Sequence, residues 1–163
     1  MKMAKFHGLA LVVSALALAG CNASPGMADA PAQSEAGMAV IPVTIVQDGK
    51  RHLFHAEVAA TPAEQQRGLM YRRSIARDAA MLFPFAQPKF ASFWQKNMLI
   101  SIDMIYIRAD GTIDRIVENT IPGNEEPAVS GGEVAAVLEV AAGTAERLGL
   151  DDTATVSWTW TPQ

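Results

Sequence analysis

The chain has 163 residues, of which 50% are hydrophobic and 18% are charged, and its formal net charge is -4 at pH 7. These values fit a single folded domain, and they exclude a large multidomain assembly and a chain that is disordered throughout. The acidic balance argues against sequence-independent nucleic-acid binding, so we expect no nucleic-acid partner. One cysteine and three histidines leave no intramolecular disulfide and no cysteine-rich zinc site, and we predict neither a metal nor a cofactor.

The N-terminus has the pattern of a secretory signal. Lys2 and Lys5 precede an uncharged apolar run over residues 9–19, which is too short to span a bilayer. The run ends in Leu18-Ala19-Gly20-Cys21, which resembles the lipobox of bacterial lipoproteins, where the cysteine is lipidated and becomes the first residue. We therefore predict a signal peptide over residues 1–20, a lipid anchor at Cys21 and an exported, envelope-located protein that faces the periplasm.

The segment after this cysteine has the composition of a linker. Residues 22–39 are rich in Ala, Pro, Ser and Gly and carry almost no large apolar side chain. Such a segment cannot bury a core, so residues 21–39 are predicted to be the anchor and a flexible tether, followed by one domain over residues 40–163. The acyl chains would bind the membrane without help from the domain. In bacterial lipoproteins an Asp after the cysteine favours the inner membrane. Asn22 stands there instead, which weakly favours the outer membrane in a cell that has one.

The first half of the domain is predicted to be mainly strand. Two β-rich runs, 40–47 and 52–59, flank Asp48-Gly49-Lys50, a strong hairpin signal. Thr61-Pro62-Ala63-Glu64 is a capping box with proline at the first helical position, and it predicts a short helix to about Met70. Four further apolar stretches follow, over residues 81–85, 90–95, 99–108 and 112–119. A second hairpin turn, Asp110-Gly111, is predicted between the last two.

The second half continues this pattern. The segment that contains Pro122, Gly123, Pro127, Gly131 and Gly132 is predicted to be a loop, too long and polar to be another strand. Strands over 134–140 and 154–160 flank a short helix that begins at Gly143-Thr144 and ends near Gly149. We predict an α+β, mainly β domain, with a small curved or barrel-like sheet and two short helices.

Most familiar catalytic and metal-binding patterns are absent from the sequence. There is no nucleophile elbow, no phosphate-binding glycine loop and no zinc-protease or EF-hand motif. His52 and His55 lie three apart in a predicted strand, so their side chains point to opposite faces and chelation is not expected. Trp158 and Trp160 share one face of the last strand, where core packing is favoured over stacking on sugars.

A polar and aromatic cluster is the first candidate site. Asp103 is a carboxylate within an otherwise apolar run, and a buried carboxylate needs hydrogen bonds or a cation. Lys96, Asn97 and Arg67 are the candidate partners, and Trp94 could stack on a ligand. We predict that these five side chains converge in one patch. The alternative is that Asp103 is a satisfied core carboxylate that fixes a loop, and residue types alone favour this alternative.

Two further features are ambiguous. Arg67 and Arg72 lie at the end of the predicted helix, where they could bind an anion or complement the helix dipole; the latter is slightly favoured. Glu139 is a lone carboxylate in an apolar strand, and it is either a site residue or an outward side chain on a half-exposed strand.

The sequence resembles the DUF192 family of bacterial and archaeal domains from about residue 41 to residue 158. The resemblance rests on several short pieces: Glu57-Val58-Ala59, Arg67-Gly68-Leu69-Met70, Met81-Leu82-Phe83, Phe93-Trp94, Lys96-Asn97, Ile102-Asp103, Asp110-Gly111, Val137-Leu138-Glu139 and Ala142-Gly143. It implies a compact, largely β domain with a barrel-like sheet, and it supports the importance of Asp103 and Lys96. It implies no activity, substrate or cofactor.

The chain departs from the family pattern at four places. Ala80 precedes Met81-Leu82-Phe83 where the family has Gly, and Gln95 and Met98 replace Met and Thr around Lys96-Asn97. Ser101 replaces a usual proline, and Thr153-Ala154 replaces a frequent Gly-Asp turn.

The leading interpretation is a lipid-anchored binding or accessory module whose ligand is a small molecule or a cell-wall fragment. One rival is a small hydrolase or transferase in which Asp103 or Glu139 is the general base and Lys96 or Arg67 stabilises negative charge. Another is a purely structural envelope protein. Two convergent carboxylates in a cleft would favour the enzyme.

Overall fold

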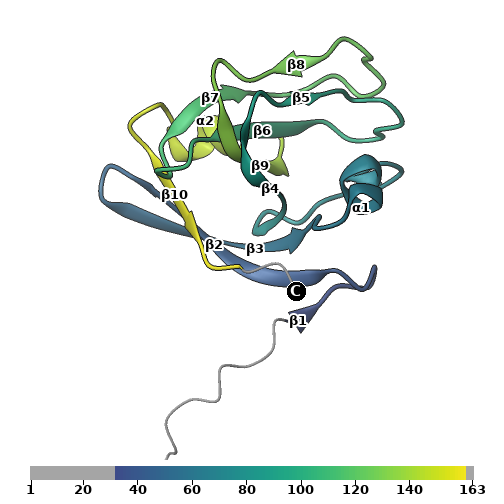
Figure 1. The fold of residues 1–163 in the computed structure, drawn as a ribbon, viewed down its shortest axis with the longest axis horizontal. Coiled ribbons are helices and arrows are strands. Elements are labelled where there is room, and N and C mark those ends of the chain that lie inside the picture. Colours follow the sequence, from purple (N-terminus) through teal and green to yellow (C-terminus); the bar gives the residue numbers. More distant parts are fainter. Residues whose placement is uncertain (1–31, 161–163) are drawn as a thin grey trace, which may run out of the picture.

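The computed structural model describes residues 32–160 (Figure 1). The predicted signal peptide, Cys21 and the first part of the tether lie outside these residues. Two short helices accompany ten strands: α1 (Pro62–Arg67), α2 (Thr144–Leu148), β1 (Ala32–Gln33), β2 (Ala39–Gln47), β3 (Lys50–Val58), β4 (Ala79–Lys89), β5 (Ser92–Phe93), β6 (Ile102–Ile107), β7 (Ile113–Val117), β8 (Ala128–Val129), β9 (Val134–Ala141) and β10 (Thr155–Trp158). The predicted fold class, mainly β with two short helices, is confirmed.

Short sequence motifs correctly predicted the first hairpin and the start of the first helix. Asp48 and Gly49 both have positive φ, 51° and 73°, as the tight turn between β2 and β3 requires. At α1, the Thr61 hydroxyl accepts from the backbone N–H of Glu64 at 3.2 Å, and the Glu64 carboxylate accepts from the N–H of Thr61 at 2.8 Å. The helix ends at Arg67, before the predicted Met70, because Gly68 leaves the helical conformation with a φ of 47°.

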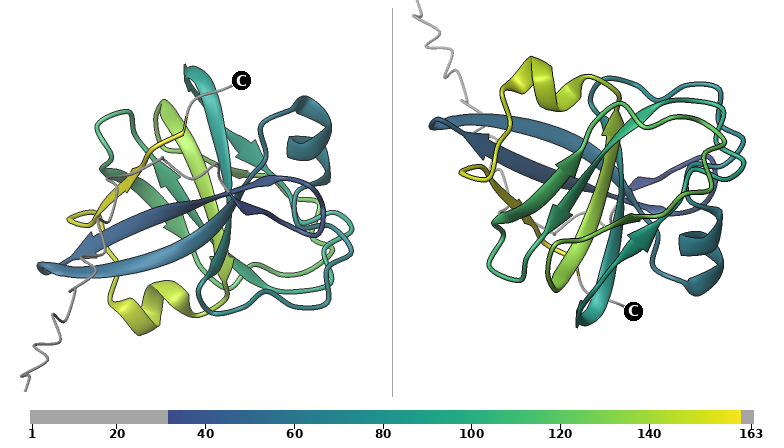
Figure 2. Two further views of the ribbon diagram at one scale, coloured as in Figure 1. Left: turned by 90° about the horizontal axis from the view of Figure 1, so that it is seen from below. Right: turned by 90° about the horizontal axis from the view of Figure 1, so that it is seen from above.

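The main sheet has eight strands and curls into a half-barrel. Its order is β1-β2-β3-β4-β9-β6-β7, and β10 pairs with β2. Strand β10 also reaches the opposite edge of the sheet, because the N–H of Val156 donates to the carbonyl of Gly111 at 2.8 Å. The two edges of the curled sheet therefore approach each other at β10, and the two helices lie at opposite ends of the sheet (Figure 2).

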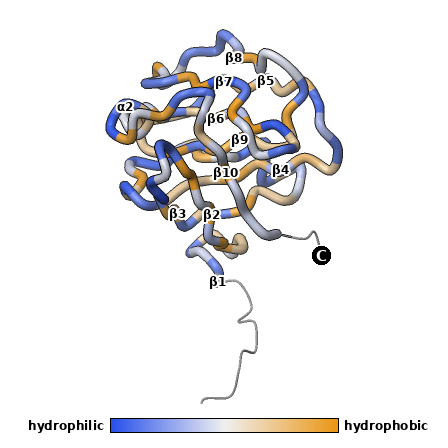
Figure 3. The backbone as a smooth tube through the Cα atoms, turned by 90° about the vertical axis from the view of Figure 1, so that its left-hand side faces the viewer, coloured by the Kyte–Doolittle hydropathy of each residue, from blue (hydrophilic) through white to orange (hydrophobic). Residues whose placement is uncertain are grey.

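Each face of the sheet carries its own hydrophobic core. One core lies inside the half-barrel and combines side chains of β2, β3, β10 and α2, with Trp158 and Trp160 packed against it as predicted. The other core lies on the opposite face of β4, β9 and β6 and contains Phe83, Met104 and Tyr106. Hydrophobic segments run through the middle of the molecule and hydrophilic turns lie at its periphery (Figure 3).

A short two-stranded ribbon covers the second core. Strand β8 pairs with β5, with Ser92 opposite Val129 and Phe93 opposite Ala128. The expectation that the segment around Pro127 contains no strand is therefore wrong. The pairing partner lies far away in the chain, so the local composition of this segment could not reveal it.

Residues 32–39, which the composition assigns to the tether, are instead part of the fold. Ala32 and Gln33 pair with Val40 and Ala39, and Met38 is buried in the second core. The described part of the domain thus begins before residue 40.

Candidate functional site

Glu139 lies on the central strand β9, beneath the β5–β8 ribbon. Its cross-strand neighbours are Met81 on β4 and Met104 on β6, so all three side chains lie on the face of the second core. Glu139 is 5% exposed. Within residues 32–160 its carboxyl makes no hydrogen bond and no ion pair. The expectation of an outward side chain on a half-exposed strand is wrong, because β9 is paired on both sides and covered from above.

Burial controls the charge of this carboxyl. Removal from water raises the pKa of Glu139 from its ordinary value of 4.5 to about 8. The group is therefore mainly neutral at pH 7, and it can donate a hydrogen bond as well as accept one. Tyr106 lies nearby on the same face; burial raises the pKa of its hydroxyl, which donates to the carbonyl of Ala128 at 2.9 Å.

Glu139 borders a cavity of about 270 Å³. The cavity lies between the end of α1, strand β4 and the segment that contains β5. We call it the Glu139 cavity. Besides Glu139, three groups of side chains line it: an apolar group (Leu69, Met70, Phe83, Phe85, Phe90, Phe93, Trp94, Met98), a cationic group (Arg67, Lys89, Lys96) and a polar group (Gln65, Gln66, Ser92). The cavity is thus apolar on its walls, with one carboxyl and three cations.

The aromatic wall of the cavity is fixed from the sheet below. The ring of Phe93 packs edge-on against Phe83 at 5.1 Å and against Tyr106 at 6.3 Å, measured between ring centroids. Edge-to-face pairs of this kind hold both rings in one orientation.

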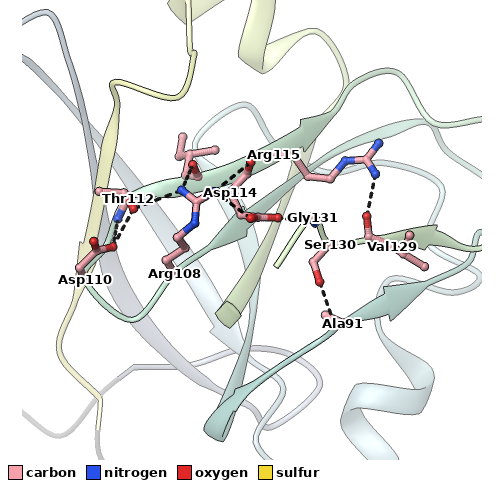
Figure 4. Close-up of polar contacts among 10 residues, drawn as sticks. Ala91, Arg108, Asp110, Thr112, Asp114, Arg115, Val129, Ser130 and Gly131 are labelled. Carbon is pink, nitrogen blue, oxygen red and sulfur yellow. Dashed lines mark hydrogen bonds and ion pairs between the residues drawn. The ribbon is translucent and has the colours of Figure 1, made fainter. Parts of the chain in front are cut away.

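Hydrogen bonds fix the other strand of the ribbon. Arg115 donates to the carbonyl of Val129 at 2.7 Å, and the N–H of Gly131 donates to the carboxylate of Asp114 at 2.6 Å (Figure 4). The hydroxyl of Ser130 accepts from the N–H of Ala91 at 3.0 Å, which joins β8 to the segment before β5. The ribbon is therefore held in a defined position over Glu139.

The cationic group has no counter-charge in the part of the chain described. The ion pairs within residues 32–160 join other side chains, and none includes Arg67, Lys89 or Lys96. The Lys89 ammonium lies 4.1 Å from the centroid of the Phe85 ring, a cation–π contact. With Glu139 neutral, the lining of the cavity carries three positive charges and no negative charge.

Four of the six predicted site residues line the Glu139 cavity: Arg67, Trp94, Lys96 and Glu139. Asn97 does not line it. The backbone of Asn97 has a φ of 59°, its carbonyl accepts from the N–H of Tyr71 at 3.0 Å, and its side-chain amide lies 3.8 Å from the sulfur of Met70. Asn97 thus fixes the chain at the edge of the cavity.

Asp103 belongs to the opposite face of the sheet. Its carboxylate accepts from the backbone N–H groups of Asn119 at 2.8 Å, Gly143 at 3.2 Å and Ala145 at 2.9 Å. The prediction that Lys96, Asn97 or Arg67 would be its partner is wrong, because backbone amides satisfy it.

The second reading of Asp103, a satisfied core carboxylate that fixes a loop, is the one that the structure supports. Asp103 is 0% exposed, so no substrate can reach it as a general base. It pairs across strands with Val140 of the first core, whereas Glu139 faces the second. The two carboxylates therefore do not converge.

Sequence reasoning missed Lys89, Phe85 and Phe90. The signal for them is Phe85, Pro88-Lys89 and Phe90, in which a cation lies between aromatic side chains next to a proline. The alternation places the cation among rings, and Lys89 is the last residue of β4.

No group of three or more His, Cys, Asp or Glu side chains within residues 32–160 is placed to hold a metal ion. His52 and His55 are on β3, and His55 lies 3.7 Å from Asp78. In the same range, no helix has the length and apolar character that a membrane span requires.

The fold and the cavity define a small, mainly β domain in which a buried carboxyl, without a hydrogen-bond partner among residues 32–160, borders a cationic and aromatic cavity. The chain belongs to the DUF192 family, described as an uncharacterized ACR, which matches residues 43–158. No curated protein matches the sequence.

Two solved structures are similar over most of the domain. One is a protein of unknown function from Novosphingobium aromaticivorans, with 37% identity, a TM-score of 0.77, and coverage of 80% of this chain and 94% of that chain. The other is described as a putative transcription regulator from Sinorhizobium meliloti, with 38% identity, a TM-score of 0.72, and coverage of 74% of this chain and 95% of that chain.

Proposed function

We propose that this protein is a binding module whose ligand site is the Glu139 cavity. The observation that carries the proposal is Glu139 itself, 5% exposed, without a partner among the described residues, and bordering the cavity. The carboxyl oxygens of Glu139 are not sealed from solvent, so a ligand that enters the cavity can form a hydrogen bond with them. Concave, mainly apolar cavities with a few polar groups are the usual form of small-molecule sites.

The surroundings of Glu139 support binding over a purely structural role. Trp94 lines the cavity and is 56% exposed, so its ring is free to stack on a ligand. Lys96 is exposed and has no ion pair within residues 32–160. A side chain kept only for stability would not require either feature.

The experiment compares two equally exposed apolar side chains. Trp94→Ala removes a ring from the cavity, and Leu53→Ala removes a side chain that is 55% exposed on β3, away from the cavity. A small-molecule fragment library is screened by ligand-observed NMR against the purified full-length protein. We expect hits whose affinity falls at least tenfold in Trp94→Ala and in Glu139→Leu, which removes the carboxyl, and stays unchanged in Leu53→Ala. Hits whose affinity is the same for wild type and for both cavity variants would contradict the proposal.

The proposed location is the cell envelope, with the chain anchored through lipid at Cys21 and exposed to the periplasm. The lipobox-like Leu18-Ala19-Gly20-Cys21 and the apolar run before it support this location. The test is metabolic labelling with palmitate in a bacterial host. Wild type should be labelled and recovered with membranes, and Cys21→Ser should be neither. Equal labelling of the two chains would refute the anchor.

A second candidate function is a small hydrolase or transferase with Glu139 as its general base. The shared lining supports it, because Arg67 and Lys96 border the same cavity and could stabilise a developing negative charge. The base form of Glu139 requires ionisation, so the rate should rise as the pH rises through about 8. A fragment or ester turned over with this profile, and not by Glu139→Gln, would favour the enzyme.

A further inference from the structure

We propose that the ligand of the Glu139 cavity is a small organic anion, a carboxylate or phosphate joined to an aromatic or branched apolar group. This inference rests on the proposed function and adds to it the chemical class of the ligand. Three properties of the cavity support it: the sign of its charge, the nature of its walls and its volume.

The charge of the lining selects against cations. Arg67 comes from the end of α1, Lys89 from β4, and Lys96 from the segment after β5, so positive charge borders the cavity from three separate elements. Arg67 also borders a neighbouring groove that is lined by Glu35, Glu57 and Glu64. Of these acids, Glu64 caps the helix and Glu57 makes a two-pronged ion pair with Arg72 at 2.7 and 2.6 Å. Lys89 and Lys96 do not border that groove and make no ion pair within residues 32–160, so they are available to an anion.

Glu139 acts as a hydrogen-bond donor in this setting. Tyr106 on β6 lies on the same face as Glu139, and burial raises the pKa of its hydroxyl, so it stays neutral near pH 7. A neutral Glu139 donates its proton to an oxygen of the ligand. An ionised Glu139 would repel the acidic group of the same ligand, so the protonated form is the one that binds.

The walls and the volume limit the body of the ligand. Phe83, Phe93 and Met98 present ring edges and a thioether, which fit an aromatic ring or a branched alkyl group. The cavity has a volume of about 270 Å³ and is partly open to solvent. A single small molecule or one terminal residue of a larger molecule fits this volume.

The test uses three molecules of nearly equal size that differ in charge. Purified full-length protein is titrated at pH 7 with 3-phenylpropionate, 3-phenylpropanamide and 3-phenylpropylamine, and dissociation constants are measured by ligand-observed NMR. We expect the acid to bind at least tenfold more tightly than the amide, and the amine not to bind. Phenyl phosphate then distinguishes a phosphate from a carboxylate as the preferred acidic group.

Two variants and their controls locate the effect. Lys96→Ser should weaken binding of the acid and leave binding of the amide unchanged. Lys50→Ser replaces an exposed lysine at the start of β3 and should alter neither. With wild type, affinity for the acid should fall about tenfold between pH 7 and pH 9, because only the fraction with protonated Glu139 binds. Glu139→Gln keeps a donor that does not titrate and should remove this dependence on pH.

The outcomes separate the two proposals. Equal binding of acid and amide, or preferential binding of the amine, would overturn the anionic class and leave the cavity as a binding site. The anionic class would also be refuted if neither 3-phenylpropionate nor phenyl phosphate binds the cavity while fragments of other chemistry do bind it. When no fragment loses affinity in Trp94→Ala or in Glu139→Leu, the proposed function itself fails.

Discussion

Replacing Glu139 by glutamine should stabilise the protein at neutral and alkaline pH but not at acid pH. Burial raises the pKa of this carboxyl from 4.5 to about 8, so the folded state holds the proton more tightly than the unfolded state. The stability that this proton contributes is fully present below about pH 4.5 and is lost as the pH rises to about 8. Glutamine is neutral at every pH and does not lose it.

The magnitude follows from the size of the shift. Each pKa unit corresponds to about 1.4 kcal/mol, so a rise from 4.5 to about 8 corresponds to about 5 kcal/mol as an upper limit. Water that enters the cavity would reduce this value. We expect the difference in free energy of unfolding between Glu139→Gln and wild type to grow by about 1 kcal/mol per pH unit from pH 5 to pH 8.

The assay is urea denaturation of the full-length proteins at several pH values from 5 to 9. The control is Glu146→Gln, which removes an exposed carboxylate from α2 and should parallel wild type throughout. Other titrating groups are common to all three proteins, so they cancel in the differences. A difference between Glu139→Gln and wild type that stays constant with pH would refute the reasoning, because it would mean that Glu139 is ionised in the folded protein.

Three further predictions test the parts of the fold that hold the site. Asp103→Asn should lower the free energy of unfolding by about 3 kcal/mol, because the amide has one acceptor oxygen, so its NH2 group must face at least one of the three backbone N–H groups that now donate to the carboxylate. Combining it with Lys96→Met should be additive, as expected for side chains that do not touch, and a coupling free energy of about 1 kcal/mol would contradict the placement. Gly111→Ala should lower the free energy of unfolding by about 3 kcal/mol, because the φ of Gly111 is 84° and a Cβ would lie 2.7 Å from the carbonyl oxygen of Val156. The control, Gly123→Ala, has a similar φ of 78° but open space around it, and it should cost about 1 kcal/mol. Equal melting temperatures of the two variants would show that β10 does not close the sheet at Gly111. Thr61→Ala should lower the free energy of unfolding by about 1 kcal/mol, because α1 loses its N-terminal cap. A calorimetric scan can detect this loss. An unchanged melting temperature would mean that the cap does not contribute to stability.

Short-range patterns predicted the local structure well. The Asp-Gly turns and the capping box at Thr61 act through residues within three or four positions, so their signals are complete in the sequence. The mainly β class follows from the same local patterns. The β5–β8 ribbon was missed because its two strands have two residues each and meet across a long separation in the chain.

The candidate site was predicted in part for a similar reason. Arg67, Trp94 and Lys96 are exposed residue types near one another in the pattern, and they do line one cavity. The partners of Asp103 are backbone N–H groups, which every residue carries and no sequence pattern displays. Side-chain chemistry alone therefore assigned it the wrong partners.

Asp103 and Glu139 look alike in the sequence, and their hydrogen bonds separate them. Each is a carboxylate within an apolar strand, and each is buried. Asp103 receives three backbone N–H groups at 2.8 to 3.2 Å, which satisfy its charge and tie the start of α2 to the sheet. Glu139 receives none within residues 32–160, although its cross-strand neighbours are two methionines.

An apolar residue at position 139 would fit between these methionines and avoid the cost of burying an unpartnered carboxyl. A stability requirement therefore accounts for Asp103 and does not account for Glu139. The cations around the cavity likewise make no ion pair within residues 32–160. An anionic ligand with an oxygen for Glu139 would suit both features at once, since it would pair with the cations and accept a hydrogen bond from the buried acid.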